Sequence, residues 1–218
     1  MKKKICALLL TFAMLLTLLS ACGGGSDTAA PTRGSWDGNT FTSSYLGLQF
    51  TSPGQPWHIF SNDEIAERLE LTDGQMGTGT DIPNSLWTDP GFVIDFVLVN
   101  AENGSSVGLV YERFLAGVSE QIHLRACGDN EIEMYAEEGF EVEYELTGTI
   151  MIAGIEWHAK RTTIDLGMPG LTLLGLSSET IILHLVNRDG RFFRCVSITV
   201  SSEEELAEIM SWFSPYGG

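Results

Sequence analysis

The side chains most able to do metal or nucleophilic chemistry here are four histidines and two cysteines: His58, His123, His158, His184, Cys127 and Cys195. His123 and Cys127 are four residues apart on a predicted helix, so an imidazole and a thiolate could share one face. A metal site needs further converging ligands, and no second pair with ligand spacing follows. We therefore expect no metal site and no cofactor. We interpret His158 and His184 as sheet residues whose hydrogen bonds are satisfied.

Acidic side chains are a second candidate for chemistry. Glu141, Glu143 and Glu145 alternate along a predicted strand and project to one face of it. General acid–base catalysis needs a buried carboxyl with a raised pKa, whereas these three should be solvated. Their functional interpretation is a docking face for a divalent cation or a basic protein. No nucleophilic side chain has a base and an orienting group at a recognisable spacing in the sequence, so we expect no catalytic residues.

Trp87 is a candidate for partner contact. It lies at the end of the segment 74–91, which has no clear period and contains four glycines and two prolines, and we predict a long loop there. Functional residues concentrate on such loops, and an exposed tryptophan is a natural contact point for a partner. The alternative interpretation is that Trp87 caps the core.

The N-terminus indicates where the protein goes. Three lysines at residues 2–4 precede an apolar run, Ile5 to Leu19, which is too short to span about 30 Å of hydrocarbon. This pattern predicts a signal peptide over residues 1–21. Leu19-Ser20-Ala21-Cys22 resembles the bacterial lipobox, which implies cleavage before Cys22 and lipidation of its thiol. We expect residues 22–40, which begin with a Gly-rich stretch, to be a flexible linker. The expected location is the extracytoplasmic face of the cell membrane.

Composition restricts the partners. The chain has 12 basic and 29 acidic side chains, a net charge of −17, and removal of a segment with three lysines and no acids makes it −20. Such a charge argues against nucleic acid. It is compatible with cationic partners, although solubility alone explains it. Residues 41–216 suit a single domain with a sizeable core.

The positioning elements follow from periodicity. Phe140 to Leu146 alternates apolar and polar residues and predicts a strand. Further strands are predicted at 45–51, 92–99, 107–111, 155–160, 180–186 and 192–200. Ser61-to-Glu64 and Ser202-to-Glu205 are capping boxes that begin helices. A third helical region spans roughly 114–138, and we expect Leu115, Val118, Ile122 and Ala126 to share its inward face and a break at 128–130. Strands in runs with separate helices predict an α+β fold, a largely antiparallel sheet flanked by helices.

This order of elements resembles the PsbP-like fold, shared with the Ran-binding Mog proteins, and lipoproteins of Gram-positive bacteria that carry it. The resemblance lies in Tyr45–Pro53 with Trp57, the capped helix at Asp63, Gly154–Trp157 and the closing segment Ser197–Phe213. Residues 54–56 depart from it, because the family usually has a shorter turn there. The resemblance implies an α/β/α sandwich and a binding or assembly accessory, and it implies no catalytic site.

The two domain cysteines, Cys127 and Cys195, could form a disulfide, because export permits one. The alternative is two buried free thiols that pack as small apolar residues. Our functional hypothesis is a membrane-anchored, non-enzymatic binding or assembly module that meets the membrane through Cys22 and has a protein partner. The alternatives are a cell-envelope hydrolase or metal-dependent enzyme, and a solute-capture lipoprotein.

Overall fold

The computed structural model describes residues 32–69, 92–114, 117–167, 178–190 and 192–217. The predicted signal peptide, Cys22, the loop 74–91 and Trp87 lie outside these ranges. No described helix is both long and apolar enough to cross a bilayer.

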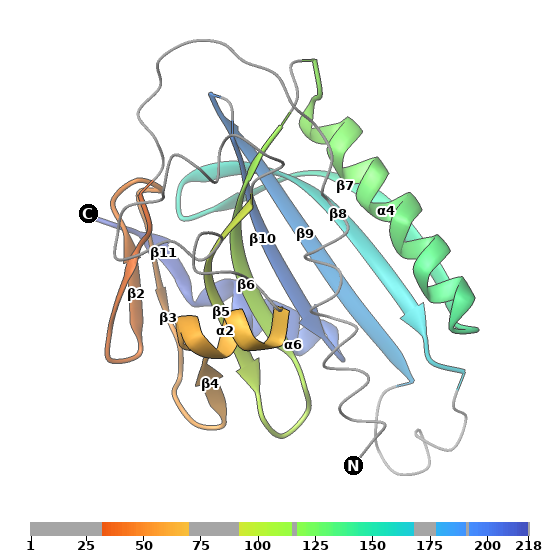
Figure 1. The fold of residues 1–218 in the computed structure, drawn as a ribbon, viewed down its shortest axis with the longest axis horizontal. Helices are drawn as coiled ribbons and strands as arrows, with labels where there is room; N and C mark the ends of the chain where they lie inside the picture. The colour runs from red at the N-terminus through yellow and green to blue at the C-terminus, as the bar shows by residue number, and fades with distance from the viewer. Residues whose placement is uncertain (1–31, 70–91, 115–116, 168–177, 191, 218) are drawn as a thin grey trace.

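Eleven strands and three helices make up the described chain (Figure 1). The strands are β1 (Ser35–Asp37), β2 (Thr40–Ser43), β3 (Leu48–Thr51), β4 (Trp57–Ile59), β5 (Phe92–Asn100), β6 (Ser106–Arg113), β7 (Glu141–Ile152), β8 (Ile155–Asp165), β9 (Glu179–Asp189), β10 (Phe192–Val200) and β11 (Phe213–Pro215). The helices are α2 (Asn62–Leu69), α4 (Glu120–Glu137) and α6 (Glu203–Ser211).

Two antiparallel sheets carry the domain. The large sheet has seven strands in the order β4-β5-β6-β10-β9-β8-β7, and the small sheet has four in the order β1-β2-β3-β11. The strands predicted at 140–146, 155–160, 180–186 and 192–200 are confirmed, and they pair as two antiparallel hairpins, β7 with β8 and β9 with β10. The predicted α+β class with a largely antiparallel sheet is therefore confirmed.

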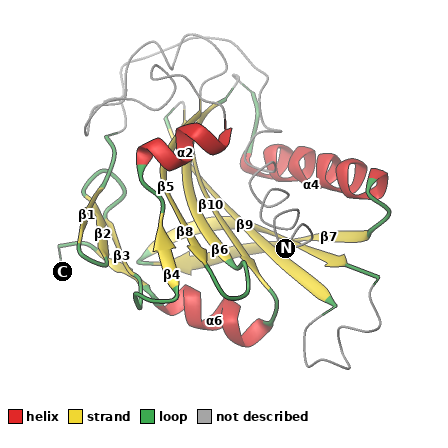
Figure 2. Cartoon of the chain, turned by 60° about the horizontal axis from the view of Figure 1, so that its bottom comes forward, coloured by secondary structure: helices red, strands yellow, loops and turns green. Residues whose placement is uncertain are grey.

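Both faces of the large sheet are covered. Figure 2 shows α2 and α4 on one face and α6 on the other. Phe60, Ile65, Val97, Leu124 and Phe193 belong to the core on the α2–α4 side. The other core joins the large sheet to α6 and the small sheet through residues such as Phe41, Phe50, Phe96, Trp157 and Ile209. The second layer is thus a helix together with a small sheet, where we expected helices alone.

The N-terminal boundary of the domain lies earlier than predicted. Residues 35–40, which we placed in the linker, form β1 and its turn to β2. The Trp36 ring packs against Phe41, Phe50 and Phe96, with ring centroids 5.4, 6.2 and 5.5 Å away. A composition rich in Gly and polar residues predicted a linker, but one aromatic side chain with three aromatic partners outweighs it.

Helix α4 runs unbroken through residues 128–130, where we predicted a break. Gly128 is tolerated in the helix because the Tyr144 ring of β7 packs directly against it. A Cβ atom at residue 128 would lie 2.6 Å from Cδ1 of that ring. The close approach of helix and strand therefore requires glycine at this position.

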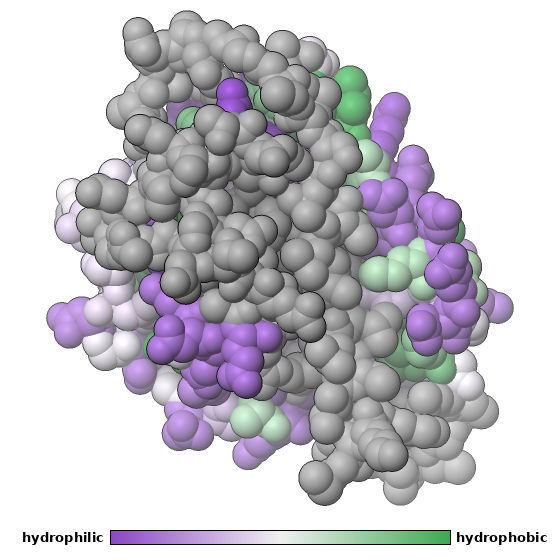
Figure 3. All heavy atoms as spheres, in the orientation of Figure 1, coloured by the Kyte–Doolittle hydropathy of each residue, from purple (hydrophilic) through white to green (hydrophobic). Residues whose placement is uncertain are grey.

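The predicted inward face of α4 is wrong at Ile122 and Ala126. Val118, which precedes the helix, does pack against the core, and Leu115 lies outside the described residues. Ile122 is 53 % exposed and Ala126 is exposed. The buried side chains of α4 are Leu124, Cys127, Gly128, Glu131 and Tyr135. Figure 3 shows mainly hydrophilic side chains along the outer side of α4. Periodicity failed here because the face that meets the sheet carries Cys127, Gly128 and Glu131, whereas the rule looks for a stripe of large apolar side chains.

A β-bulge in β5 positions one further buried acid. The pairing of β5 with β6 shifts between Ile94 and Phe96, so Asp95 is the extra residue. Bulges commonly re-aim a side chain. The Asp95 carboxylate accepts hydrogen bonds from Tyr111 Oη at 2.8 Å and from the Gly34 amide at 3.0 Å. It therefore ties the segment before β1 to the centre of the large sheet.

Candidate functional site

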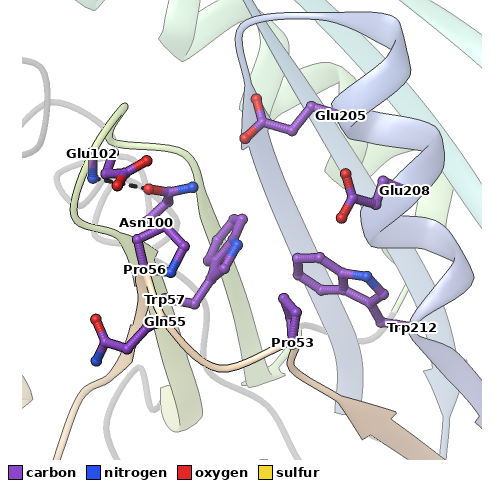
Figure 4. Close-up of a pocket in the computed structure, with 9 residues that line it drawn as sticks. All are labelled: Pro53, Gln55, Pro56, Trp57, Asn100, Glu102, Glu205, Glu208 and Trp212. Atoms are coloured by element: carbon purple, nitrogen blue, oxygen red, sulfur yellow. Dashed lines mark hydrogen bonds between the residues drawn. The ribbon is translucent and has the colours of Figure 1, made fainter.

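A surface pocket of about 340 Å³ opens between the loop before β4, the β5–β6 turn and α6 (Figure 4). Its lining combines acidic, aromatic and proline side chains: Pro53, Gln55, Pro56, Trp57, Asn100, Glu102, Glu205, Glu208 and Trp212.

The two indoles are held by the fold. Trp57 begins β4, where its amide donates to the Gly54 carbonyl at 2.8 Å, and it is 7 % exposed. Trp212 follows α6 and meets Trp57 edge to face, with centroids 5.1 Å apart. It also contacts Phe50 of the small sheet at 5.7 Å. The pocket therefore lies where the large sheet, the small sheet and α6 meet.

The β5–β6 turn is fixed to α6 by side chains. Asn100 Oδ1 accepts from the amide of Glu102 at 2.9 Å, which shapes the turn. Asn103 Nδ2 donates to Glu205 Oε1 at 2.8 Å, and Glu205 Oε2 accepts from the Ser201 amide at 3.3 Å. Glu205 is thus an anchored carboxylate in the first turn of the helix, where the helix dipole also favours a negative charge.

Glu102 and Glu208 are exposed. In Figure 4 the carboxylates of Glu205 and Glu208 point toward the turn that carries Glu102. Three carboxylates around two indole rings provide ion pairing and ring faces for one positively charged group. This chemistry suits a lysine or arginine side chain better than an anionic or wholly apolar ligand.

The acidic face predicted from the sequence does not belong to this pocket. Glu141, Glu143 and Glu145 are exposed on β7, which is the opposite edge of the large sheet from β4. The structure therefore does not bring them together with the pocket. Sequence reasoning missed the pocket, because its residues come from three distant segments whose motifs, such as the Ser202-to-Glu205 capping box, indicate structure and not binding.

A second polar cluster lies buried between α4 and the sheet. Lys160 and Thr162 both donate to Glu131 Oε2, the threonine at 2.5 Å, and His184 Nε2 lies 2.7 Å from Glu131 Oε1. Burial opposes ionisation of Glu131, but the neighbouring His184 and Lys160 outweigh it and hold its pKa at about 2. Burial lowers the pKa of Lys160, while Glu131 acts in the opposite direction. The cluster therefore contains a charged pair that α4 and β8 share.

The alternation of apolar and polar residues along β8 predicts that Lys160 faces solvent. In the structure its side chain is fully buried. The alternation itself is right, since Trp157 and Ala159 lie in the core on the opposite face. The error arises because both faces of β8 are covered. Lys160 is directly opposite His184 in the β8–β9 pairing, which places both under α4.

A third group, about two turns earlier on α4, involves one of the two domain cysteines. Ligand atoms of Glu112, His123 and Cys195 all lie within 4.8 Å of one another. His123 Nε2 is 3.5 Å from Glu112 Oε2 and 4.0 Å from Cys195 Sγ. We expected no metal site because only the His123–Cys127 pair showed ligand spacing. The fold adds Glu112 from β6 and Cys195 from β10, which no spacing in the sequence could reveal.

Burial governs ionisation in this third group. It raises the pKa of Glu112 to about 8 and lowers that of His123 to about 4, the latter helped by the nearby His184 and Lys160. It also raises the pKa of the Cys195 thiol well above its usual value. Cys127 and Cys195 are both buried and both free thiols here. Their disulfide stays a prediction.

Comparison with known proteins gives a similarity of fold. The structure is similar to the solution structure of cyanobacterial PsbP (CyanoP) from Synechocystis sp. PCC 6803. The match has a TM-score of 0.42 and 12 % identity and covers 91 % of this chain and 99 % of that one. Both this similarity and the resemblance in the sequence concern the fold alone. No protein-family model matches the chain, and no curated protein matches it.

Proposed function

We propose that this protein is a lipid-anchored, extracytoplasmic binding module that receives a cationic segment of a partner protein in the pocket beside Trp57 and Trp212. The observation that carries the proposal is the convergence of Glu102, Glu205 and Glu208 around two edge-to-face indoles. Aromatic side chains at a concave site are frequent contact points in interfaces, and cations bind their ring faces. The net charge of −17 would draw a basic segment toward this surface.

The test compares peptide binding by two charge-matched variants. A lysine- and arginine-rich peptide and a glutamate-rich peptide of equal length are titrated into the domain, and binding is followed by tryptophan fluorescence and calorimetry. Glu102→Gln with Glu208→Gln should weaken binding of the basic peptide about tenfold, or about 1.4 kcal/mol. The control, Glu141→Gln with Glu143→Gln, removes the same charge from the opposite edge of the sheet and should leave affinity nearly unchanged. Equal losses in both variants would mean that net charge alone attracts the peptide.

The anchoring part of the proposal rests on the signal pattern that ends at Cys22. Cys22→Ala should release the protein from the membrane fraction or leave an uncleaved precursor, because the lipobox thiol would be the attachment point. Fractionation with detection of processing checks this. A Cys22→Ala protein that is processed normally and stays with the membrane would contradict the anchor.

The hydrolase alternative gains no support from the described residues with nucleophilic side chains. Gly104-Ser105-Ser106-Val107-Gly108 matches the spacing of a nucleophile elbow, but Ser106 begins β6 after a hairpin turn, where a strand-to-helix turn would be needed. Cys195 lies near His123, yet it is buried and burial keeps the thiol protonated. A cysteine nucleophile needs the thiolate and access to substrate.

A further inference from the structure

The most telling unexplained group in the domain is the buried set Glu112, His123 and Cys195. One residue comes from β6, one from α4 and one from β10, so the group spans the interface between the helix and the middle of the large sheet. Zinc–ligand bonds of about 2.0–2.3 Å in a tetrahedron separate neighbouring ligand atoms by about 3.3–3.8 Å. The observed 3.5 Å between His123 Nε2 and Glu112 Oε2 falls in that range, and 4.0 Å between His123 Nε2 and Cys195 Sγ is slightly wider.

A second observation points to a bound cation. Glu112 is 5 % exposed, and its Oε1 atom is buried without a hydrogen-bond partner among the described residues. A buried carboxyl oxygen without a partner is costly, and native structures normally satisfy it with a donor or an ion. The two basic side chains further along α4 do not serve it, since Lys160 and His184 meet Glu131. A cation between Glu112, His123 and Cys195 would compensate the charge of this buried carboxyl group, whose Oε2 is 3.5 Å from His123 Nε2.

The best-placed fourth donor is Cys127, whose sulfur lies outside the group of ligand atoms within 4.8 Å of one another. It lies one turn after His123 on α4, so both side chains project from the same side of the helix. It is buried, and it is close enough to Glu112 and Cys195 to interact with both electrostatically. Two thiolates, one imidazole and one carboxylate select a borderline or soft divalent ion over Ca²⁺ or Mg²⁺.

The surroundings hold the first three donors in place. The His123 ring packs on Phe193 with centroids 4.7 Å apart, and Phe193 stacks on Phe114 at 4.2 Å. Glu112 is directly opposite Phe193 in the β6–β10 pairing, so Glu112 and His123 both lie beside the Phe193 ring. Such support is what a metal site needs beyond its ligands.

We propose that Glu112, His123, Cys127 and Cys195 form a closed, structural Zn²⁺ site that fixes α4 on the large sheet. Four protein ligands leave no open position, which is the arrangement of structural and not catalytic zinc. The site also accounts for the polar inward face of α4, because a helix bound through a metal needs less apolar surface against the sheet. A Cys127–Cys195 disulfide would consume two of the four donors, so the two states exclude each other.

Metal binding by the unmodified domain is the first test. The reduced protein is stripped with chelator and titrated with Zn²⁺ against a chromophoric chelator, and with Co²⁺ as a spectroscopic substitute. We expect one equivalent to bind and Co²⁺ to give a thiolate charge-transfer band with the intense visible bands of a tetrahedral site. Zinc at about a thousandfold above its Kd should raise Tm by roughly 8 °C or more. Octahedral Co²⁺ spectra, or binding abolished by excess Ca²⁺, would show only surface carboxylate binding and overturn the proposal.

Variants then identify the ligands. Cys195→Ser should abolish the tetrahedral spectrum, Cys127→Ser should roughly halve the charge-transfer intensity, and Glu112→Gln should lower the affinity for zinc at least tenfold. His158→Ala is the matched control, since that residue lies outside the group, and it should bind zinc as the parent does. Circular dichroism establishes that each variant is folded. Unchanged zinc binding in a folded Cys195→Ser protein would rule the site out. Oxidation that pairs the two cysteines should block zinc binding, and full binding by the oxidised protein would contradict the assignment of both sulfurs.

Discussion

The indoles of Trp57 and Trp212 meet edge to face at 5.1 Å, with their planes at 89°. One begins the edge strand of the large sheet, and the other follows the last helix. This contact joins α6 and the small sheet to β4, and the same two rings line the acidic pocket. Stability and the proposed binding would therefore depend on the same two residues, which makes the pair the first target for mutation.

Trp212→Ala should lower the free energy of unfolding by about 2–3 kcal/mol. The estimate is below that for a fully buried tryptophan, because Trp212 is only partly buried. Its ring loses contacts with both Trp57 and Phe50. Urea unfolding followed by circular dichroism gives the value. Trp212→Phe is the matched control and should cost markedly less, and an alanine variant as stable as the parent would refute the importance of the contact.

Removal of residues before Phe41 should destabilise the domain, contrary to the dispensable linker that composition suggested. A protein that begins at Thr32 should unfold like one that begins at Gly23. A protein that begins at Phe41 should lose about 3–5 kcal/mol, because Trp36 leaves three aromatic partners and Asp95 loses the Gly34 amide. Denaturant melts of the three proteins decide this. Equal midpoints for all three would show that β1 contributes nothing.

The titration of Asp95 should lower the free energy of unfolding of the domain as pH rises from about 4 to 6. Burial raises the pKa of Asp95 to about 6 from the usual 3.8, although Tyr111, Gly34 and Arg33 act in the opposite direction. Between these values the folded state holds more protons than the unfolded state, so the free energy of unfolding decreases with pH and levels off above about 6. The contribution is about 2–3 kcal/mol.

Asp95→Asn isolates this effect, because an amide can keep the contacts with Tyr111 and the Gly34 amide without titrating. The difference in unfolding free energy, parent minus variant, should decline by about 2–3 kcal/mol between pH 4 and pH 7. Urea unfolding at four pH values measures it. A difference that stays constant across this range would mean that Asp95 keeps an ordinary pKa.

Gly128→Ala should destabilise the protein by about 1–3 kcal/mol, although alanine is the better helix former by up to about 1 kcal/mol. The added Cβ would lie 2.6 Å from the Tyr144 ring, which its hydroxyl fixes by donating to Asp129 Oδ1 at 2.8 Å. In a Tyr144→Ala background the same change should become neutral or stabilising. A double-mutant cycle measures this coupling. An increase in stability in the parent background would contradict the tight approach of α4 and β7.

Local patterns predicted most of the fold because they act over a few residues. Alternation placed β7 and β8, the strand patterns at 180–186 and 192–200 placed β9 and β10, and the Ser61–Glu64 box placed α2. The second capping box is only half formed. Ser202 Oγ accepts from the Glu205 amide, whereas the Glu205 carboxylate turns to Ser201 and Asn103.

Sequence patterns could not predict the buried polar groups, since these depend on which faces are covered. Alternation shows that the side chains of Lys160 and Ala159 point to opposite faces of the sheet. Only the tertiary structure shows that a helix covers the face on which Lys160 lies. The same limit hid Glu112 and Cys195, which reach His123 from two strands. Pairing across a sheet joins residues at any separation, so spacing along the chain carries no signal for such groups.

The early start of the structured domain limits how far it could stand from a membrane. Only ten residues, Gly23 to Thr32, separate the proposed lipid-bearing Cys22 from Arg33, which already contacts Asp95 and Asn62. Even a fully extended chain of that length reaches at most about 35 Å. A domain of this size has a radius of gyration of about 16 Å, so the tether is no longer than the domain is wide. This tether would keep the acidic pocket close to the bilayer surface. The partners within reach would then be proteins that are bound to the membrane or lie against it.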